Sequence, residues 1–215
     1  MYFTDEFQEH LGSIVSLDAV ELERFPATTM ESICKWETDN GVRMPEDLKQ
    51  MYLFTNGLKF TWDGRIGVYL GWQNRRWVVM SLAARESTEV RLTGQVCINH
   101  LNELKEIQLM CEAKEGYELS ENPLECFGED LIQFNRSNKF YELEHCADDS
   151  RIVIAPSGPH QGVYLLDRSL GLSRLCRAFT NYIRLAMLHL TILGWQHHLV
   201  GMESPYLSHV SCFAL

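Results

Sequence analysis

The stretch from Met44 to Trp62, which reads MPEDLKQMYLFTNGLKFTW, contains the clearest structural pattern in the chain. Pro45 suits the first turn of a helix, where its missing N–H is not needed, and the two acidic residues after it favour the positive end of the helix dipole. Helical spacing places Leu48, Met51 and Tyr52 on one inward face. An Asn-Gly pair then supplies a left-handed turn, after which apolar and polar residues alternate. The stretch therefore predicts a helix followed by a strand with one buried face.

Further helices and strands are expected on both sides of this stretch. One helix is expected to begin near Thr4, and a second to begin at a Thr-x-x-Glu capping box that opens at Thr28. This second helix should place Met30, Ile33 and Cys34 on one face. Strands are predicted at 66–72 and 76–80, joined as a hairpin, and at 89–99, 139–145, 151–155 and 161–166, with a short helix at 101–109. The strands should form a mostly antiparallel sheet.

The last predicted element is a long C-terminal helix from about Leu172 to Leu199. Its apolar residues recur at helical spacing, and its second half is apolar on nearly all sides. No acidic residue occurs between Arg168 and Met202, so this helix is a candidate partner-binding surface through Arg177 and Arg184. N-terminal helices, a mostly antiparallel sheet and a long C-terminal helix predict an α+β fold in a single domain over residues 1–215.

The composition narrows the class of protein. The chain has 215 residues, of which 46% are hydrophobic, which is enough apolar material for a folded core. Its formal net charge of −10 argues against nucleic acid or an anionic membrane as a partner of the whole surface. No run of apolar residues is long enough to span a bilayer, and the N-terminus turns acidic at once, unlike a signal peptide. The seven cysteines include no C-x-x-C pair, so free thiols in the cytosol are expected.

No motif of catalysis, phosphate binding or metal binding occurs in the sequence. Neither a G-x-S-x-G elbow nor a glycine-rich phosphate loop is present. The doublets His145-Cys146 and His197-His198 do not make metal sites by themselves, because neighbours in sequence point in different directions. We therefore expect no enzyme activity, no cofactor and no metal. An enzyme whose Cys/His or carboxylate site is assembled only by the fold stays open as an alternative.

A protein-binding surface is the remaining kind of site. The tip of the predicted hairpin carries Trp72, Arg75, Arg76 and Trp77, and Trp and Arg are the side chains most enriched at interface hot spots. The alternative is that one or both Trp side chains fill the core beneath the hairpin. The stretch 111–130 is rich in acidic residues and is expected to be a solvated loop.

The helix, Asn-Gly turn and strand that follow Met44 resemble the signature of the SUKH superfamily. That superfamily includes a fungal cell-wall synthesis regulator and many bacterial toxin-immunity proteins. The resemblance implies a SUKH-like fold with a core over about 28–200. The hairpin at 63–87 is expected to be an insertion into this fold, and 111–130 an acidic loop. One function that it leaves open is a stand-alone module that binds a single unrelated protein.

Several blocks, at 34–37, 58–62, 164–170 and 179–196, more narrowly resemble the family of tubulin polyglutamylase complex subunit 2. The signature residues of this fold are Trp36, Pro45, Asp47, Leu48, Asn56, Gly57, Trp62, Asp167 and Arg168. The resemblance implies a non-catalytic scaffold or adaptor subunit, which supports glutamate addition to tubulin tails by a separate tubulin-tyrosine-ligase-like subunit. Its partners would be the other subunits, with tubulin contacted indirectly. It also implies a cytoplasmic location at the cytoskeleton, with the centrosome and ciliary basal body as candidate places.

Overall fold

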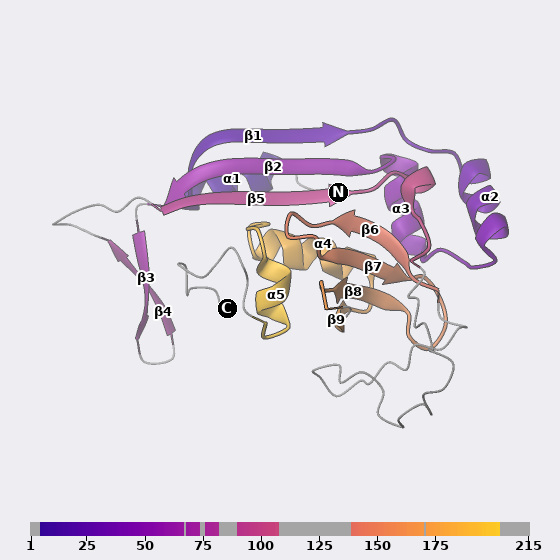
Figure 1. Ribbon diagram of the computed structural model, residues 1–215. Coiled ribbons are helices and arrows are strands. Elements are labelled where there is room, and N and C mark those ends of the chain that lie inside the picture. Colours follow the sequence, from indigo (N-terminus) through magenta and orange to yellow (C-terminus); the bar gives the residue numbers. More distant parts are fainter. Residues whose placement is uncertain are drawn as a thin grey trace, which may run out of the picture. The chain divides into compact units, whose positions relative to one another are not determined.

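The computed structural model describes residues 5–66, 68–73, 76–81, 90–107, 139–169 and 171–202. The chain forms two compact units, each built from segments far apart in sequence. The first contains Met1–Arg24, Leu58–Cys97 and Ile183–Leu215, and the second contains Phe25–Gly57 and Ile98–Tyr182. Helices and antiparallel strands occur in the chain, which confirms the α+β class (Figure 1). That the chain is a single domain with an insertion at 63–87 stays a prediction.

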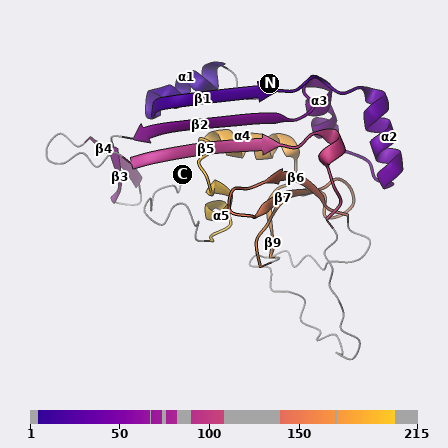
Figure 2. The ribbon, with the colours of Figure 1, turned by 45° about the horizontal axis from the view of Figure 1, so that its top comes forward.

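The first unit is built on a three-stranded sheet. The sheet consists of β1 (Ser16–Arg24), β2 (Leu58–Ile66) and β5 (Val90–Ile98), in the order β1-β2-β5 (Figures 1 and 2). Helix α1 (Asp5–Ile14) precedes β1. Leu58, Phe60 and Trp62 are buried along one face of β2, as their alternation predicted. Helix α1 packs on this face, since the rings of Phe7 and Phe60 meet edge to face at 5.7 Å. Residues 16–24 were not expected to form a strand.

The predicted hairpin after β2 is confirmed in its backbone. Strands β3 (Val68–Gln73) and β4 (Arg76–Ser81) pair antiparallel as a separate two-stranded sheet. Trp72 lies opposite Trp77 in the register, and Gln73 lies opposite Arg76. The acidic stretch 111–130 and position 75 lie outside the described residues.

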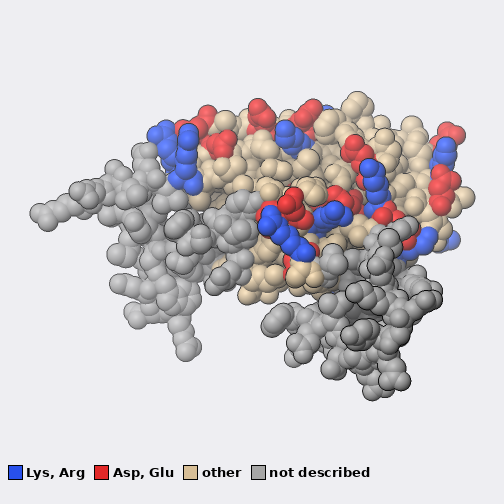
Figure 3. Space-filling model, in the orientation of Figure 1, with Lys and Arg blue, Asp and Glu red and all other residues tan. Residues whose placement is uncertain are grey.

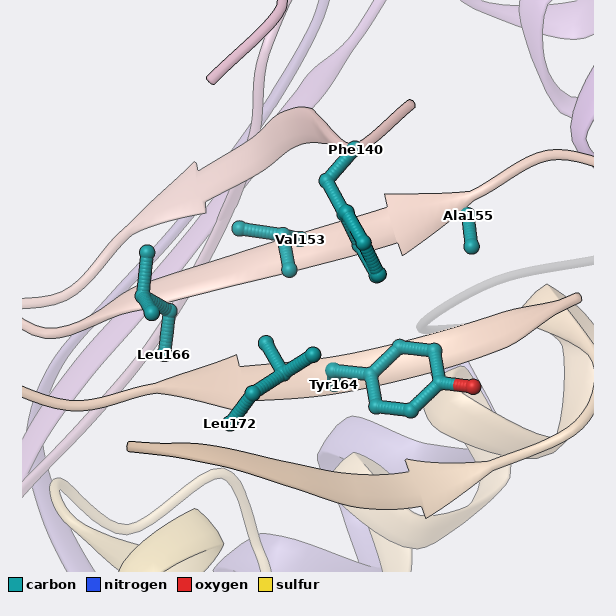
Figure 4. Packing of buried hydrophobic residues seen from close by; sticks show 6 residues of the cluster. All are labelled: Phe140, Val153, Ala155, Tyr164, Leu166 and Leu172. Carbon is teal, nitrogen blue, oxygen red and sulfur yellow. The ribbon is translucent and has the colours of Figure 1, made fainter. Parts of the chain in front are cut away.

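The second unit contains two helices and a four-stranded antiparallel sheet. The helices are α2 (Met30–Asn40) and α3 (Glu46–Phe54), and the strands are β6 (Tyr141–His145), β7 (Arg151–Ala155), β8 (Gly162–Leu166) and β9 (Leu172–Cys176). The sheet order is β6-β7-β8-β9. One hydrophobic cluster of this unit is formed by Phe140, Val153, Ala155, Tyr164, Leu166 and Leu172 (Figure 4). The strands predicted at 139–145, 151–155 and 161–166 are confirmed as β6, β7 and β8.

The prediction of a long C-terminal helix is wrong. Residues 172–199 instead form β9, helix α4 (Phe179–Leu188) and helix α5 (Trp195–Leu199). Strand β9 forms because Asp167 closes a tight turn with Gly171 by two hydrogen bonds of 2.8 and 3.0 Å, which returns the chain alongside β8. Leu172 and Leu175 are spaced as on a helix, but this spacing cannot distinguish a helix from a short edge strand.

Helix α4 ends where the backbone turns left-handed. Leu190 and Thr191 have φ values of 54° and 56°, a conformation that residues other than glycine rarely adopt, β-branched ones such as threonine least of all. The indole N–H of Trp62 lies 2.8 Å from the carbonyl oxygen of Leu190 and 3.0 Å from the hydroxyl of Thr191. Trp62 therefore holds this turn in place, and the turn stops the helix that the apolar pattern would otherwise continue.

After this turn the chain pairs with β5. The amide of Gln95 donates to the carbonyl of Thr191 at 2.8 Å, and the amide of Leu193 donates to Thr93 at 3.0 Å. Gly94 lies between these bonds, and a Cβ atom there would lie 1.9 Å from Nε1 of Trp62. Only glycine therefore lets the indole reach its two acceptors.

Smaller corrections concern the helix ends. The helix expected at 101–109 is only a 3-10 turn, η1 (Leu101–Glu103), because the amide of Ile107 already bonds to Phe140 beside the sheet. The capping residue of α2 is Thr29, not Thr28, and its hydroxyl accepts from the Ser32 amide.

Two further details of the predicted helices are wrong. Of the three residues expected on the inward face of α2, only Ile33 is buried, whereas Met30 is 47% exposed and Cys34 is exposed. The inward stripe instead runs from Ile33 through the half-buried Trp36. Pro45 stands one position before the first turn of α3, as its N-cap.

We predict that Gly94→Ala destabilises the protein by about 2 kcal/mol or more, because the new methyl group overlaps the Trp62 indole. The free energy of unfolding from denaturant titration measures this. Gly12→Ala in α1 is the matched control, since its Cβ would lie 3.6 Å from Cδ1 of Leu17, an ordinary contact. That variant should be neutral or gain up to about 1 kcal/mol. Equal stability of the two variants would show that the close approach at Gly94 is unimportant.

Candidate functional site

Asp47 joins the starts of two helices in the second unit. Its Oδ1 accepts from the amide of Leu48 at 3.0 Å in the first turn of α3. Its Oδ2 accepts from the amide of Thr180 at 2.8 Å in the first turn of α4. A carboxylate at the positive ends of two helix dipoles stabilises both, so this signature residue has a structural role.

Asn56 and Gly57 position the chain that follows α3. Oδ1 of Asn56 accepts from the amide of Leu101 at 2.9 Å, which ties α3 to η1. Gly57 has a φ of 91°, and a Cβ there would lie 2.7 Å from the carbonyl oxygen of Ile98. The Asn-Gly pair is therefore required by a left-handed turn and a close backbone approach, and neither residue presents a reactive group.

Trp36 and Glu37 hold α2 in the second unit. The ring of Trp36 meets that of Tyr141 edge to face at 4.8 Å. Oε1 of Glu37 lies 2.8 Å from Nζ of Lys49 and accepts from the amide of Met44 at 2.7 Å. Burial opposes the ionisation of Glu37, but these two donors outweigh it, so the pKa of Glu37 lies below its ordinary value. The α2–α3 corner is thus held by a partly buried ion pair.

Arg168 links two turns of the four-stranded sheet. Its Nε donates to the carbonyl oxygen of Asp148, and its Nη2 lies 3.3 Å from Oδ2 of Asp149, in the β6–β7 turn. Asp167 beside it closes the β8–β9 turn. Of the remaining signature residues, Leu48 is buried in the core and Trp62 holds the end of α4.

Glu144, Cys146 and Cys176 each have a hydrogen-bond partner inside the protein. Glu144 is 2% exposed, and its Oε2 accepts from the hydroxyl of Tyr182 at 2.5 Å. Burial, then the nearby charge of Glu144, raises the pKa of the Cys146 thiol. Burial likewise raises the pKa of Cys176 to about 11. Both thiols are therefore protonated at neutral pH and poorly suited to act as nucleophiles.

The C-terminal histidines of the first unit lie at the end of α4 and in α5. His189 stacks on Trp195 with ring centroids 5.3 Å apart. Burial, then the nearby charge of His198, lowers the pKa of His189.

Within the described ranges, no group of three or more His, Cys, Asp or Glu side chains could hold a metal ion. No helix in the described part of the chain is long and apolar enough to cross a membrane.

The six predicted partner-binding residues come from three segments of the chain, namely the β3–β4 hairpin, the position directly after β9, and α4. Trp72, Arg76 and Trp77 lie on β3 and β4, and Arg75 lies outside the described residues. Whether the Trp side chains face a partner or the core stays a prediction.

Arg177 and Arg184 are both exposed but belong to different units, Arg177 before α4 and Arg184 within it. One turn after Arg184, Leu188 is 58% exposed. Arg184 and Leu188 together give α4 a basic and apolar exposed face, which suits contact with a protein.

Charges do not gather into one large patch on the face seen in Figure 3. Acidic and basic side chains are interspersed there among uncharged ones. Two exposed acidic residues on β1, Glu21 and Glu23, were missed because residues 16–24 were given no structure from sequence. The alternation of Val20 and Leu22 with these two glutamates is the signal that could have revealed the strand.

The chain is similar to tubulin polyglutamylase complex subunit 2 of three mammals. The proteins from rat (Rattus norvegicus) and mouse (Mus musculus) are each 24% identical over 185 residues, which is 82% of this chain and 57% of theirs. The human (Homo sapiens) protein is 24% identical over 194 residues, 87% of this chain and 60% of its own. The chain thus spans somewhat more than half the length of these relatives. No family model and no solved structure matches it.

We predict that Asp47→Ala lowers the free energy of unfolding by about 1–3 kcal/mol, because two helix-start amides lose a charged acceptor. Asp47→Asn should lose less, since an amide oxygen still accepts a hydrogen bond. Denaturant titration of the two variants, with Asp39→Ala in the exposed last turn of α2 as control, measures the difference. If Asp47→Ala and Asp39→Ala behave alike, the cap does not stabilise the fold.

His189 should make the protein less stable in mild acid. Its folded pKa lies below the ordinary value of about 6.5, so on acidification the unfolded chain takes up a proton before the folded chain does. Its stabilising contribution is complete above that ordinary value and is lost as the pH falls through the folded pKa. His189→Phe, which keeps a ring against Trp195, should therefore lose less stability than the original chain between pH 7.5 and 5.5. Thermal unfolding at both pH values tests this, with exposed His10→Gln as control.

Proposed function

We propose that this chain is a non-catalytic, partner-binding subunit of a tubulin polyglutamylase complex. The observation that carries the proposal is its similarity, over 82–87% of its length, to proteins named as subunit 2 of that complex. A match of this length includes parts of both compact units, because neither unit contains that much of the chain. The likeness therefore extends through the fold and is not confined to one short motif.

The structural roles of the signature residues support a binding function over a chemical one. Asp47, Asn56, Trp62 and Asp167 each direct their polar atoms to backbone groups of the same chain. The thiols of Cys146 and Cys176 have raised pKa values. Exposed groups such as Arg184 are left for contact with other proteins.

The proposed role is to hold other subunits together, among them a tubulin-tyrosine-ligase-like enzyme that adds the glutamates. Tubulin tails are strongly acidic, and a chain with a net charge of −10 is a poor receptor for them over its whole surface. Tubulin would accordingly be contacted through the partners. A cytoplasmic location at the cytoskeleton, including the centrosome or ciliary basal body, belongs to the same proposal, as does a SUKH-like fold.

Affinity purification of the tagged chain from its native cells, with mass spectrometry of the recovered proteins, tests this proposal. We expect a tubulin-tyrosine-ligase-like enzyme together with other cytoskeletal subunits. Recovery of a single unrelated protein, or of none, would contradict membership of the complex. Addition of the purified chain to the recovered ligase should change glutamate incorporation, whereas the chain alone should incorporate none.

The exposed face of α4 gives a more specific prediction. Arg184→Glu should reduce the recovery of at least one complex member several-fold, because reversal of an interface charge adds repulsion to the lost attraction. The control is Lys35→Glu, an equal charge change at an exposed position of α2. Both variants should unfold at the same denaturant midpoint as the original chain.

Unchanged recovery of every member by a chain carrying both Arg177→Glu and Arg184→Glu would exclude this surface. The same assay with Arg75→Glu and Arg76→Glu tests the hairpin.

A further inference from the structure

Among the described residues, the three-stranded sheet of the first unit has one covered edge, along β5, and one open edge, along β1. Along β5, the segment Thr191–Leu193 covers the outer edge through hydrogen bonds to Thr93 and Gln95. Strand β1 forms the opposite edge, and its only strand partner in the described part of the chain is β2 (Figure 1). Within the described residues, no second strand pairs with the outer side of Leu17–Glu23, so the backbone groups there can pair with another chain.

The core beneath the sheet is incomplete at this edge. Leu17, Val20 and Leu22 of β1 lie opposite Gly64, Trp62 and Phe60 in the register, so they share the inner face. Trp62 and Phe60 are at most 1% exposed, whereas all three β1 side chains are only half-buried. A further strand beside β1 would cover their remaining apolar surface.

The other face of β1 is acidic. Glu21 and Glu23 are exposed, lie opposite Thr61 and Lys59, and form no ion pair within 4.0 Å in the described residues. Asp18 differs, because Arg65 lies 2.8 Å from its carboxylate and the register shifts beside it. From Ala19 to Arg24 the register with β2 is unbroken, so Glu21 and Glu23 lie in the regular part of the strand.

These charges argue against a second copy of the chain at this edge. In antiparallel pairing of two β1 strands centred on Glu21, Leu22 or Glu23, a glutamate of one copy would lie directly opposite a glutamate of the other. Like charges directly opposite one another destabilise a strand pair, whereas opposite charges stabilise it. The edge therefore selects for basic side chains in the added strand.

We propose that β1 binds an extended segment of a partner protein in which apolar and basic residues alternate. The segment adds a strand to the sheet, with its apolar residues beside Val20 and Leu22 and its Lys or Arg residues beside Glu21 and Glu23. Backbone hydrogen bonds supply affinity, and the alternation supplies specificity. The inference goes beyond the proposed complex, since it defines the partner by chemistry and holds whichever protein supplies the segment.

A nine-residue peptide of alternating lysine and valine, blocked at both ends, is the probe. We expect it to bind the full chain and to slow hydrogen exchange of amides in β1, while an alternating glutamate and valine peptide does not. Protection confined to other elements, or equal binding of both peptides, would overturn the proposal. So would the absence of binding, or self-association of the chain through β1 at the concentrations used.

Charge variants test the residues themselves. Glu21→Lys with Glu23→Lys should weaken binding of the lysine peptide about two- to thirtyfold, as expected for two lost cross-strand charge pairs, and should create binding of the glutamate peptide. The control is Glu9→Lys with Asp39→Lys, an equal charge change at exposed positions of α1 and α2. A second variant, Glu21→Thr with Glu23→Thr, should bind both peptides weakly. Because threonine is favoured in strands, this variant keeps the test valid if the lysine variant folds poorly. Equal binding by the original chain and both β1 variants would overturn the proposal.

Discussion

The hydrogen bonds from the Trp62 indole to Leu190 and Thr191 are the constraint on which the first unit depends. They fix two residues in a left-handed conformation, end α4 there and lead the chain alongside β5. This arrangement is possible only because Gly94 has no side chain at the point of contact. The covered edge at β5, and hence the contrast with the open edge at β1, follows from this one buried contact.

In the second unit, a few polar side chains accept hydrogen bonds from backbone amides at helix ends and turns. Asp47 accepts from the first turns of α3 and α4, Asn56 accepts from η1, and Asp167 accepts within the turn before β9. Each of these side chains satisfies backbone groups that a helix end or turn would otherwise leave unpaired. These side chains are therefore explained by the turns and helix ends that they stabilise.

The proposed binding role relies on exposed residues, which differ from these half-buried and internally bonded ones. The α4 face offers Arg184 beside exposed Leu188, and β1 offers a backbone edge beside exposed glutamates. One surface is basic and the other acidic, so they suit different partners. Under the proposed function, these two surfaces would bind two different partner proteins.

The sequence by itself determined the elements whose signals are local. Helix α3 is determined by Pro45, by the acidic residues of its first turn and by the Asn56-Gly57 pair that ends it. The buried face of β2 is determined by the alternation of apolar and polar residues. These signals are local, because caps, turns and hydrophobic periodicity involve residues only a few positions apart. Tertiary structure decided the C-terminal third. Its apolar spacing fits a helix, yet β8 pairs with Leu172–Cys176, and Trp62, more than a hundred residues earlier, ends α4. Such contacts leave no local signal. The same reason explains why the open edge of β1 could not be found from sequence, since an edge is defined only by which neighbours the fold supplies.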